Sequence, residues 1–342
     1  MIKEKIMCSN CILDSEIPNI EFDDKGVCNY CHLLQKLDKD SPIRELNDKY
    51  FQKKINQIKY AGKNKKYDCI IGVSGGVDST YVLYLAVKLG LRPLAVHCDN
   101  GWNSELAVSN IKNMLNILNI DLYTYVINWN EFKELQKAFF KASVPDIETL
   151  TDNANTKVLY QTASKYNIKY IIKGNNFRTE GIIPRGWTYF DKKYFNYIRK
   201  KFSNVKVKRY PLMTLFNHIY YIKFKSFEIF KILNYVDYDK KNIISLIEKE
   251  LNWRNYGGKH YESIFTRFFQ SYILLNKFNI DKRKIHLSAL VCSGQLSRKE
   301  ALSEIKKSPY PKNLIEKDIK YICKKWSMDE DEFHNIFKYK PK

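Results

Sequence analysis

The segment from Tyr67 to Gly90 constrains the fold of this chain more than any other stretch. Its apolar run over residues 69–73 predicts a strand, and residues 80–89 have helical character that ends at Gly90. Between them lies SGGVDS, in which two adjacent glycines let backbone N–H groups converge on an anion at a helix N-terminus. The segment lacks the lysine of G-x-x-x-x-G-K-[ST], so it is not a Walker-type loop. We predict a strand, a phosphate-binding loop and a helix.

The residues that follow alternate between short apolar runs and stretches of helical periodicity. They predict strands and helices in turn at residues 92–98, 104–118, 122–127, 131–142, 156–166 and 169–173. This alternation is typical of a parallel sheet flanked by helices, in which ligands bind beyond the carboxyl ends of the strands. We therefore expect His97, Asp99, Gly174 and Asn175, at two strand ends, to face the same pocket as SGGVDS. A simple turn is the alternative role for Gly174.

Two later parts of the chain do not follow this alternation of strands and helices. Residues 145–155 are predicted to form a polar connection with Thr151 and Asp152 at its tip. From Phe190 onward the alternation ends, and the remaining chain is predicted to be mostly helical. Two S-x-x-E sequences are typical of capping boxes that open helices, at residues 297–300 and 327–330.

The charge of the chain is strongly basic. Its 342 residues, 44% of them hydrophobic, suffice for one large α/β domain or two modest ones. A net charge of +21 suits nucleic acid, an anionic membrane surface or phosphorylated ligands, and residues 191–225 are the densest part, with ten Lys or Arg against Asp191. Because Lys, Asn, Ile and Tyr are abundant throughout, we attribute the charge to compositional bias and do not predict a nucleic-acid partner.

Membrane insertion is not predicted. The N-terminus lacks the apolar segment of a signal peptide. The longest apolar stretch, His218 to Leu233, contains four charged residues and cannot span a bilayer. We expect a cytoplasmic protein, a location that still permits contact with a membrane surface.

Two C-x2-C sequences near the N-terminus predict a metal site, with the four thiols supplied by Cys8, Cys11, Cys28 and Cys31. Paired sequences of this kind form a tetrahedral four-thiolate site, and a turn at residues 23–26 would fold the second pair onto the first. An iron–sulfur cluster and a redox pair are the alternatives. We prefer structural Zn²⁺ because four protein ligands leave no open coordination position.

A second group of candidate residues lies in the stretch Trp253 to Ser293. Its aromatic side chains recur at helical spacing and are predicted to be core. Its cations follow a glycine pair or an aspartate and suit an anionic ligand or developing phosphate charge; they are Lys259, His260, Lys282, Arg283 and His286. A solvated helix face is the alternative for these cations.

SGGVDS resembles the PP-loop of the ATP pyrophosphatases, which cleave ATP between the α and β phosphates and transfer AMP to a substrate oxygen. Along nearly its whole length the chain also resembles the N-acetyl sugar amidotransferase family. These enzymes act in bacterial surface-polysaccharide and flagellin-sugar pathways, and they include those that make acetamidino sugars for lipopolysaccharide and for pseudaminic or legionaminic acid derivatives. The motifs that carry the resemblance are C-x-x-C at 8–11, GVCNYC at 26–31, SGGVDST at 74–80, VHCDNGWNSE at 96–105, TD at 151–152, KGNNFRTEG at 173–181, YGGKHYES at 256–263 and DKRKIHLS at 281–288.

The resemblance implies an α/β fold of the PP-loop, adenine nucleotide alpha hydrolase-like class, with a parallel sheet flanked by helices. We expect a zinc-binding module at residues 1–40, a linker and helix at 41–66, the ATP pyrophosphatase domain at 67–189 and an α-rich substrate-binding region at 190–342.

The resemblance also implies a reaction. The carbonyl oxygen of an N-acetyl group on a sugar, free or nucleotide-linked, attacks the α phosphate of ATP, and ammonia then displaces AMP to give an acetamidine. The pyrophosphate would be held, with Mg²⁺, by Ser74, Gly75, Gly76, Val77, Asp78 and Ser79, and Asp78 would help to place the metal. His97, Asp99, Gly174 and Asn175 are candidates for the adenosine side. The cations of residues 259–286 would bind the sugar's carboxylate or phosphates, or stabilise the adenylate.

Ammonia requires a source. No cysteine follows Met1, and Cys98, Cys292 and Cys323 lack a glutaminase-like context, so this chain is not expected to hydrolyse glutamine. Family members are associated with glutaminase and cyclase-like proteins, and we expect such partners here.

The alternative function is that of a PP-loop tRNA-modifying (thiolation) enzyme, which also combines cysteine pairs with SGGxDS. Those enzymes need reactive or cluster-binding cysteines beside the loop, because sulfur must reach the adenylated base. After Cys31 this chain has no further C-x-x-C, and Cys69, inside the first strand, is predicted to be inert core. A non-enzymatic zinc protein that binds nucleic acid is a third possibility, and it leaves SGGVDS unexplained.

Overall fold

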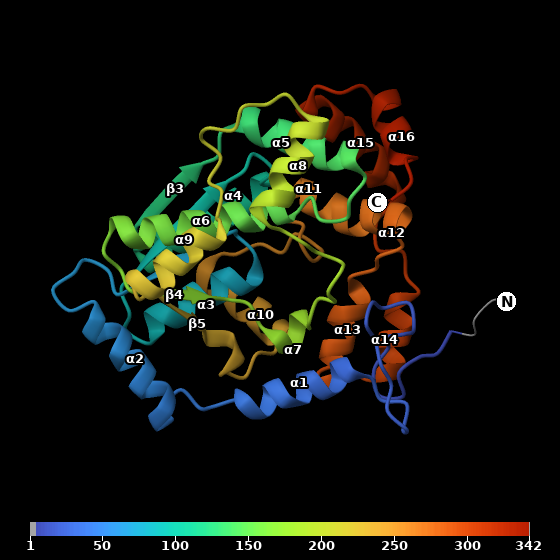
Figure 1. Cartoon of the computed structure of the whole chain (residues 1–342). Coiled ribbons are helices and arrows are strands. Elements are labelled where there is room, and N and C mark those ends of the chain that lie inside the picture. The colour runs from blue at the N-terminus through green and yellow to red at the C-terminus, as the bar shows by residue number, and fades with distance from the viewer. Residues whose placement is uncertain (1–4, 342) are drawn as a thin grey trace.

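A computed structural model describes residues 5–341 of the chain. Its centre is one parallel sheet of five strands in the order β3-β2-β1-β4-β5 (Figure 1). The strands are β1 (Cys69–Gly72), β2 (Pro93–Asp99), β3 (Leu122–Val126), β4 (Tyr170–Lys173) and β5 (Glu228–Lys231). The parallel sheet flanked by helices confirms the fold class predicted from the alternation.

The central strand β1 pairs with β2 on one side and β4 on the other, so that Cys69 lies opposite both Pro93 and Tyr170. From β1 the chain moves outward through β2 to β3, and it then returns to the other side of β1 to form β4 and β5. This reversal creates a topological switch point between β1 and β4. Open α/β sheets bind their ligands at such a point, beyond the carboxyl ends of the strands.

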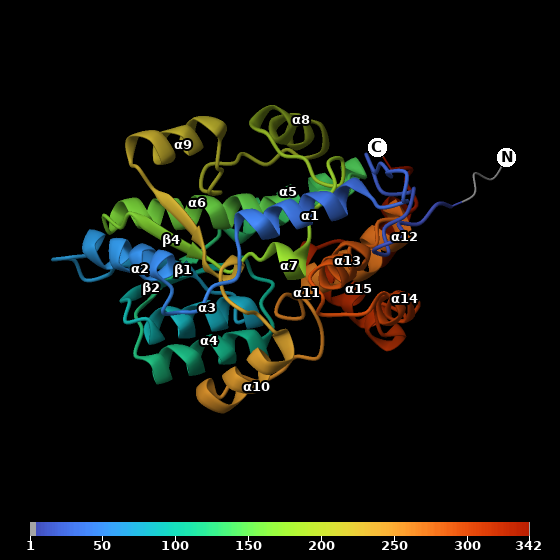
Figure 2. The same cartoon turned by 90° about the horizontal axis from the view of Figure 1, so that it is seen from below.

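Helices cover both faces of the sheet (Figure 2). One face packs on α3 (Val77–Lys88), α4 (Glu105–Leu118) and α10 (Lys240–Leu251), whereas the other packs on α6 (Thr149–Lys165) and on residues 213–227. Side chains of β1 alternate between the two: Ile71 joins the first cluster and Ile70 the second. Together these clusters are called the sheet core below.

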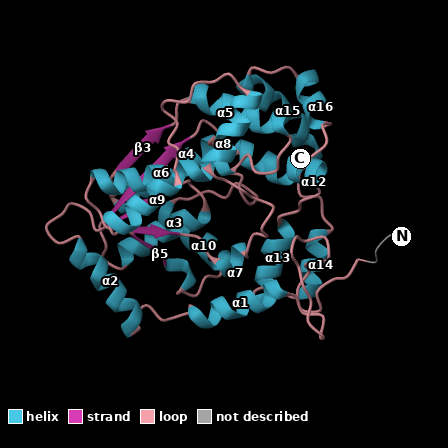
Figure 3. Ribbon diagram, viewed as in Figure 1, coloured by secondary structure: helices cyan, strands magenta, loops and turns pink. Residues whose placement is uncertain are grey.

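Helices make up most of the rest of the described chain (Figure 3). A second apolar cluster, called the helical core below, joins the first half of α6 to the C-terminal helices and contains all four N-terminal cysteines. None of the described helices is long and apolar enough to cross a membrane. The remaining helices are α1 (Asn29–Asp40), α2 (Lys49–Ala61), α5 (Trp129–Ala142), α7 (Phe177–Glu180), α8 (Lys192–Phe202), α9 (Leu215–Ile219), α11 (Ile264–Phe268), α12 (Leu274–Phe278), α13 (Arg283–Cys292), α14 (Arg298–Ile305), α15 (Lys312–Trp326) and α16 (Glu330–Phe337), with π-helical turns at Tyr220–Phe224 and Phe269–Ile273 and a 3-10 turn at Ile232–Asn234.

Three local predictions were wrong. The alternation does not end at Phe190, because β5 adds a fifth strand; it is an edge strand of only four residues with a charge at each end, too short for a periodicity signal. The stretch predicted as a polar connection contains the first two turns of α6, whose polar side chains line a cavity. The capping box predicted at Ser327 is absent, because Ser327 ends α15 with φ +53° and Asp329 caps α16. The capping box at Ser297 is confirmed.

The N-terminal cysteine segment packs against the far end of the chain. The Arg298 guanidinium, at the start of α14, donates hydrogen bonds to the carbonyl oxygens of Cys11 (2.9 Å) and Cys8 (3.0 Å). Lys284 of α13 forms an ion pair with the buried Asp14 at 2.7 Å. These contacts place the cysteines beside α13 and α14 (Figure 1).

Candidate active site

The SGGVDS loop follows β1 as predicted. Gly75 has φ +80°, and a Cβ atom there would lie 2.5 Å from the carbonyl oxygen of Ala107, so a residue with a side chain does not fit. Gly76 caps α3, whose first backbone N–H groups therefore face the loop. Ser79 Oγ lies 3.3 Å from both Ser74 Oγ and the Ser74 backbone nitrogen, which closes the loop on itself.

Residues far along the chain support this loop. Trp253 Nε1 donates a hydrogen bond to the Gly75 carbonyl oxygen at 2.9 Å, and the Val77 backbone N–H donates one to the Tyr256 hydroxyl at 3.3 Å. The Tyr238 hydroxyl donates a hydrogen bond to Asp78. The sequence analysis did not find these three aromatic residues; Tyr256 begins the YGGKHYES motif, which was a usable signal, whereas nothing in the sequence marks Tyr238.

A cavity of about 560 Å³ opens beyond the carboxyl ends of β1, β2 and β4. The predicted residues that line it are Ser74, Asp78, Ser79, His97, Gly174 and Asn175 from the strand ends, and His260 and Lys282 from the C-terminal part of the chain. Gly75, Gly76 and Val77 lie within the same loop. The structure thus brings two regions together that are about 180 residues apart in sequence.

The two candidates from β2 are placed differently. His97 Nδ1 lies 2.8 Å from the Val73 carbonyl oxygen and Nε2 lies 2.9 Å from Asn103 Nδ2, which fits a ring that donates from Nδ1 and accepts at Nε2. Asp99 instead accepts from the Gly101 backbone N–H at 2.9 Å and from Asn103 at 3.2 Å. Asp99 therefore holds the turn after β2, and it is not among the residues that line the cavity.

A smaller cavity of about 200 Å³ adjoins the first, and all five cations predicted in residues 259–286 line it. His260, Gln270 and Lys282 line both cavities and so stand between them. Arg283 is already engaged: its guanidinium binds Asp281 at 2.7 Å and donates to the Lys307 and Ile305 carbonyl oxygens. Arg283 therefore fixes the loop after α14 through these bonds, and its role in ligand binding stays a prediction.

Burial lowers the pKa of three of the other cations. Burial lowers the pKa of Lys259 to about 8, although Glu180 and Asp78 oppose the shift. Burial also lowers the pKa of Lys282, and the nearby carboxylates of Asp152 and Glu148 oppose this decrease. The pKa of His286 falls well below its usual value because of burial and the neighbouring Lys259, so this imidazole is neutral. Lys259, Lys282 and His286 thus all have pKa values lowered by burial.

Four carboxylates that the sequence analysis did not select as site residues complete this wall: Glu148, Asp152, Glu180 and Glu262. Burial raises the pKa of Glu180, and Lys259 counteracts the rise. Burial would also raise the pKa of Glu262, but the adjacent His260 holds it below the usual value. Three of them lie within the TD, TEG and YES sequences of the motifs, which was the available signal. Glu148 had none.

The four N-terminal cysteines form a compact, buried cluster. Their Sγ atoms are 3.8 Å apart between Cys8 and Cys31, 3.7 Å between Cys11 and Cys28, and 3.6 Å between Cys28 and Cys31. The Cys28 backbone N–H donates to Cys8 Sγ at 3.2 Å. A tetrahedral metal–thiolate site with bonds of about 2.3 Å has sulfur–sulfur edges of roughly 3.8 Å. Three of the six distances match this value and all four sulfurs lie within 4.8 Å of one another, so these residues could hold a metal ion.

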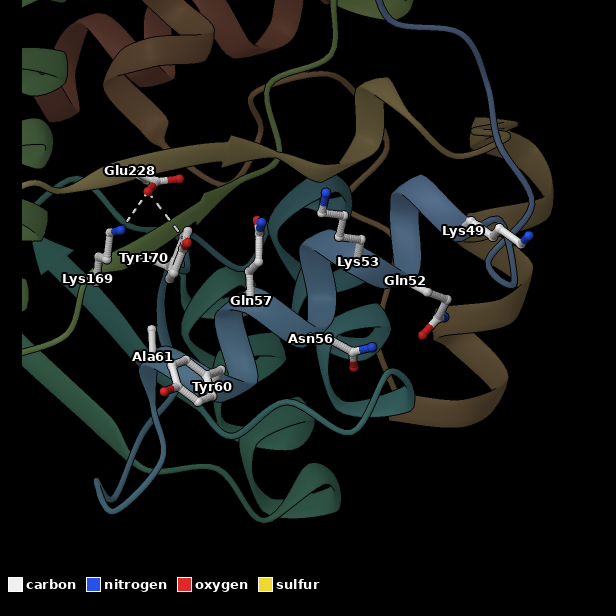
Figure 4. A pocket seen from close by; sticks show the side chains of 10 residues that line it. All are labelled: Lys49, Gln52, Lys53, Asn56, Gln57, Tyr60, Ala61, Lys169, Tyr170 and Glu228. Carbon is white, nitrogen blue, oxygen red and sulfur yellow. Dashed lines mark hydrogen bonds and ion pairs between the residues drawn. The ribbon is translucent and has the colours of Figure 1, made fainter.

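Another hollow, wider than the cavity at the strand ends, lies elsewhere. It measures about 920 Å³ and runs along α2 and the β4–β5 edge, where Glu228 pairs with Lys169 (Figure 4). Its side chains extend along the outside of α2, and none of the residues that line it belongs to SGGVDS (Figure 4). Size alone therefore does not identify the functional site; the smaller cavity at the strand ends has the convergent polar groups.

Two family models match separate parts of the chain. Residues 50–189 match the model described as NAD synthase. Residues 262–342 match the model described as LPS biosynthesis protein WbpG-like, C-terminal domain. The chain joins an NAD synthase-like PP-loop domain to a WbpG-like C-terminal domain. No curated protein matches the sequence significantly.

Solved structures that resemble the chain do so at low identity. NMN synthetase from Francisella tularensis is 19% identical, with 59% of this chain and 91% of that chain covered, at a TM-score of 0.31. The NH3-dependent NAD synthetase from Campylobacter jejuni is 16% identical, with 64% and 93% covered, at 0.30. The U34-tRNA thiolase NcsA from Methanococcus maripaludis, with its [4Fe-4S] cluster, is 14% identical, with 88% and 89% covered, at 0.38. All three TM-scores are below 0.5, so these likenesses do not bear on function.

The SGGVDS loop and the strands beside it lie within the region that resembles NAD synthase. Its cavity is closed by Glu262, Ser263, Thr266, Gln270 and Lys282, which all belong to the WbpG-like domain. The cavity is therefore lined by residues from both matched parts of the chain.

Proposed function

We propose that this protein is an ATP-dependent amidotransferase that adenylates the N-acetyl carbonyl oxygen of a bacterial surface sugar and replaces that oxygen with ammonia, forming an acetamidino group. The observation that carries the proposal is the shared cavity. In it, the SGGVDS loop of the NAD synthase-like region faces residues of the region that matches the C-terminal domain of a WbpG-like lipopolysaccharide biosynthesis protein.

The residues support distinct roles. The amide oxygen attacks the α phosphate of ATP, and the amide N–H proton leaves with the pyrophosphate. The backbone N–H groups at the start of α3 and the hydroxyls of Ser74 and Ser79 face the phosphates. Lys259 and Lys282 offset the charge that develops on them. The ring of His97 is fixed by two hydrogen bonds and forms part of the nucleotide wall.

Two metals fit the residues present. Asp78, in the loop, would hold Mg²⁺ together with the phosphates, since Mg²⁺ takes one or two carboxylates and keeps its other positions for phosphate and water. Mg²⁺ would supply neutralisation of phosphate charge. The four cysteines would hold structural Zn²⁺, because the spacing of their sulfurs matches the edges of one tetrahedron. A four-iron cluster distributes its thiolates over separate iron atoms and needs a wider spacing.

Sulfur transfer to tRNA is the rival function, and the cavity argues against it. Cys98 is the cavity-lining cysteine, and burial raises its pKa to about 12, so its thiol is not activated. Cys69 is fully buried in β1. We propose that ammonia comes from separate glutaminase and cyclase-like partner proteins and that the protein acts in the cytoplasm.

Incubation of the protein with ATP, Mg²⁺, ammonium and a panel of N-acetylated sugars tests the proposal. The expected result is release of AMP and pyrophosphate together with a sugar lighter by about 1 Da, the mass difference of an oxygen-to-NH exchange, detected by mass spectrometry. AMP release that depends on tRNA, with no change in any sugar, would refute it.

A further inference from the structure

Two carboxylate oxygens in the cavity wall, Glu148 Oε1 and Glu262 Oε2, have no hydrogen-bond partner among the described residues. Glu148 Oε1 is buried and, among the described residues, accepts no hydrogen bond, whereas Glu148 Oε2 accepts one from the Thr266 hydroxyl at 2.7 Å. The carboxylate is therefore held in one orientation with one oxygen free. A buried, unpaired carboxylate oxygen is costly to leave unsatisfied, so a ligand that donates a hydrogen bond would stabilise it.

The surroundings of Glu148 contain a second carboxylate and several cationic side chains. Asp152 lies one helical turn farther along α6 in the same cavity wall, and its backbone N–H donates to the Glu148 carbonyl oxygen at 3.1 Å. Lys282 acts on both carboxylates through space, and Lys173 and His260 act on Asp152. Burial raises the pKa of Glu148 to about 7, which matches a group that takes up and releases a proton near neutral pH.

We propose that Glu148 binds ammonium, the nitrogen donor of the reaction, at its free oxygen and removes one proton from it, with Asp152 adding attraction for the cation. This inference rests on the proposed function and names a site within the same cavity. The nearby Thr266 is a positioning residue, because it acts only by orienting the carboxylate.

The proposed step balances. Ammonium gives one proton to the Glu148 carboxylate and becomes ammonia. The nitrogen lone pair forms a C–N bond with the carbon of the neutral adenylated imidate, the C–O bond breaks, and its electron pair leaves with AMP. The product is an acetamidinium cation, and Glu148 returns its proton to solvent. No oxidant or reductant takes part.

The variant Glu148→Gln tests this role, since it keeps the shape and an oxygen for Thr266 but cannot take a proton. We expect sugar-dependent exchange of pyrophosphate into ATP, which reports adenylation alone, to stay within about twofold of wild type. The apparent KM for ammonium should rise at least tenfold at pH 7, and the defect should shrink at pH 9, where more of the donor is already ammonia. The KM for the sugar should not change.

Other outcomes are separable. An unchanged KM for ammonium with an unchanged pH profile would overturn the inference, as would a defect in the KM for the sugar alone. Absence of exchange in the wild-type protein would instead refute the proposed function itself. Glu134→Gln, on the outer face of α5 where Glu134 pairs with Lys137, is the matched control and should behave as wild type.

A separate observation concerns the surface at α9 and the π-helical turn after it, residues 215–224, called the α9 surface below. Phe216 and Phe224 are 77% and 76% exposed. They are two of six exposed apolar side chains on this surface: Leu215, Phe216, Ile219, Tyr220, Ile222 and Phe224. A contiguous exposed apolar surface of this kind marks an interaction site.

The charge around this surface indicates what it binds. Lys223 and Lys225 are exposed within or beside it, and α8, which carries five Lys or Arg, stands on the same side of the molecule as α9 (Figure 2). Over residues 191–225 ten cationic residues face one acid. Apolar side chains at the tip of a short helix, set among lysines, fit the headgroup layer of an anionic bilayer. We infer that the α9 surface docks the protein on an anionic membrane surface.

Flotation with lipid vesicles tests this second inference. The full-length protein should float with vesicles of phosphatidylcholine and phosphatidylglycerol in a 7:3 ratio and not with phosphatidylcholine alone. Phe216→Ser with Phe224→Ser should reduce the floated fraction at least fivefold, whereas Tyr60→Ser, at a side chain 79% exposed on α2, should not. Equal flotation of wild type and the double variant would overturn the inference. Self-association that the double variant abolishes, without flotation of the wild type, would assign the surface to a second copy of the chain and overturn it too.

Discussion

The cavity has two walls that are built in different ways. The strand-end wall consists of the SGGVDS loop and the ends of β2 and β4, and it belongs to the sheet core. The helical wall consists of the start of α6 and residues 256–282, and its elements pack in the helical core with the four cysteines. The strand-end wall follows from local sequence, whereas the helical wall exists only because distant segments pack together.

This difference implies a division of labour. Under the proposed function, the strand-end wall binds the nucleotide through the SGGVDS loop. The helical wall and the smaller cavity beside it hold two lysines of lowered pKa, Lys259 and Lys282, and Glu148, which has one unpaired oxygen. Changes in the two walls should therefore have separable effects on nucleotide binding and on substrate chemistry.

Removal of the metal proposed at the four cysteines should give the largest effect. Metal binding contributes about 10–16 kcal/mol in small zinc modules, and the cysteines lie in the helical core and contact α13 and α14. Chelation should abolish sugar-dependent turnover while ATP binding, measured by calorimetry, persists at the strand-end wall. Added zinc should restore turnover. Parallel loss of ATP binding would show that the two walls form one cooperative unit.

Gly75→Ala should act on the strand-end wall alone. Alanine at φ +80° costs about 1–2 kcal/mol, and its Cβ would collide with the Ala107 carbonyl, so the loop must shift. We expect ATP affinity to fall about 100-fold, equivalent to about 2.7 kcal/mol. Gly294→Ala is the control, because Gly294 has φ +73° with nothing within 4 Å of a Cβ. If both variants bind ATP equally, the close approach at Gly75 is unimportant.

Arg283→Lys separates a structural cation from a ligand-facing one. Lysine cannot reproduce the paired bonds to Asp281 and the carbonyl bonds to Lys307 and Ile305, so the free energy of unfolding should fall by about 1–3 kcal/mol. ATP affinity should not change. Arg254→Lys, at an exposed arginine with one bond to Ser109, should be neutral in the same denaturant titration. A loss of ATP affinity in Arg283→Lys would show that Arg283 takes part in nucleotide binding.

The pH dependence of nucleotide binding should be the smallest effect. Lys259 has a pKa of about 8, so its ammonium attracts phosphate below that pH and loses its charge above it. Affinity for ATP should therefore decrease several-fold between about pH 7 and 9. Lys259→Arg, which stays charged, should flatten the profile. An identical decrease in both proteins would place the titrating group elsewhere.

Much of the strand-end wall could be predicted because its signals are local. A strand, a double glycine and a helix in immediate succession specify the loop through backbone geometry, and the C-x2-C pairs specify a thiol cluster through spacing. The edge strand β5 was not predicted, because four residues with a charged residue at each end are too few to show a periodic pattern. The start of α6 was not predicted to be helical, because Thr149, Thr151 and Asp152 are polar, as in a loop. Their polar helix face is explained by the cavity beside it.

The sequence by itself determined the class of fold, the phosphate loop and the cysteine cluster, since each depends on residues that are neighbours along the chain. Only the tertiary structure decided which charges face the ligand. It engaged Arg283 with Asp281 and two carbonyls, placed Asp99 in a turn, and brought Glu148 and Lys282 to one cavity. The joint placement of Glu148 and Lys282 depends on packing between segments more than 100 residues apart. The bonds of Arg283 and Asp99 depend on side-chain geometry within nearby turns. Composition and periodicity encode neither.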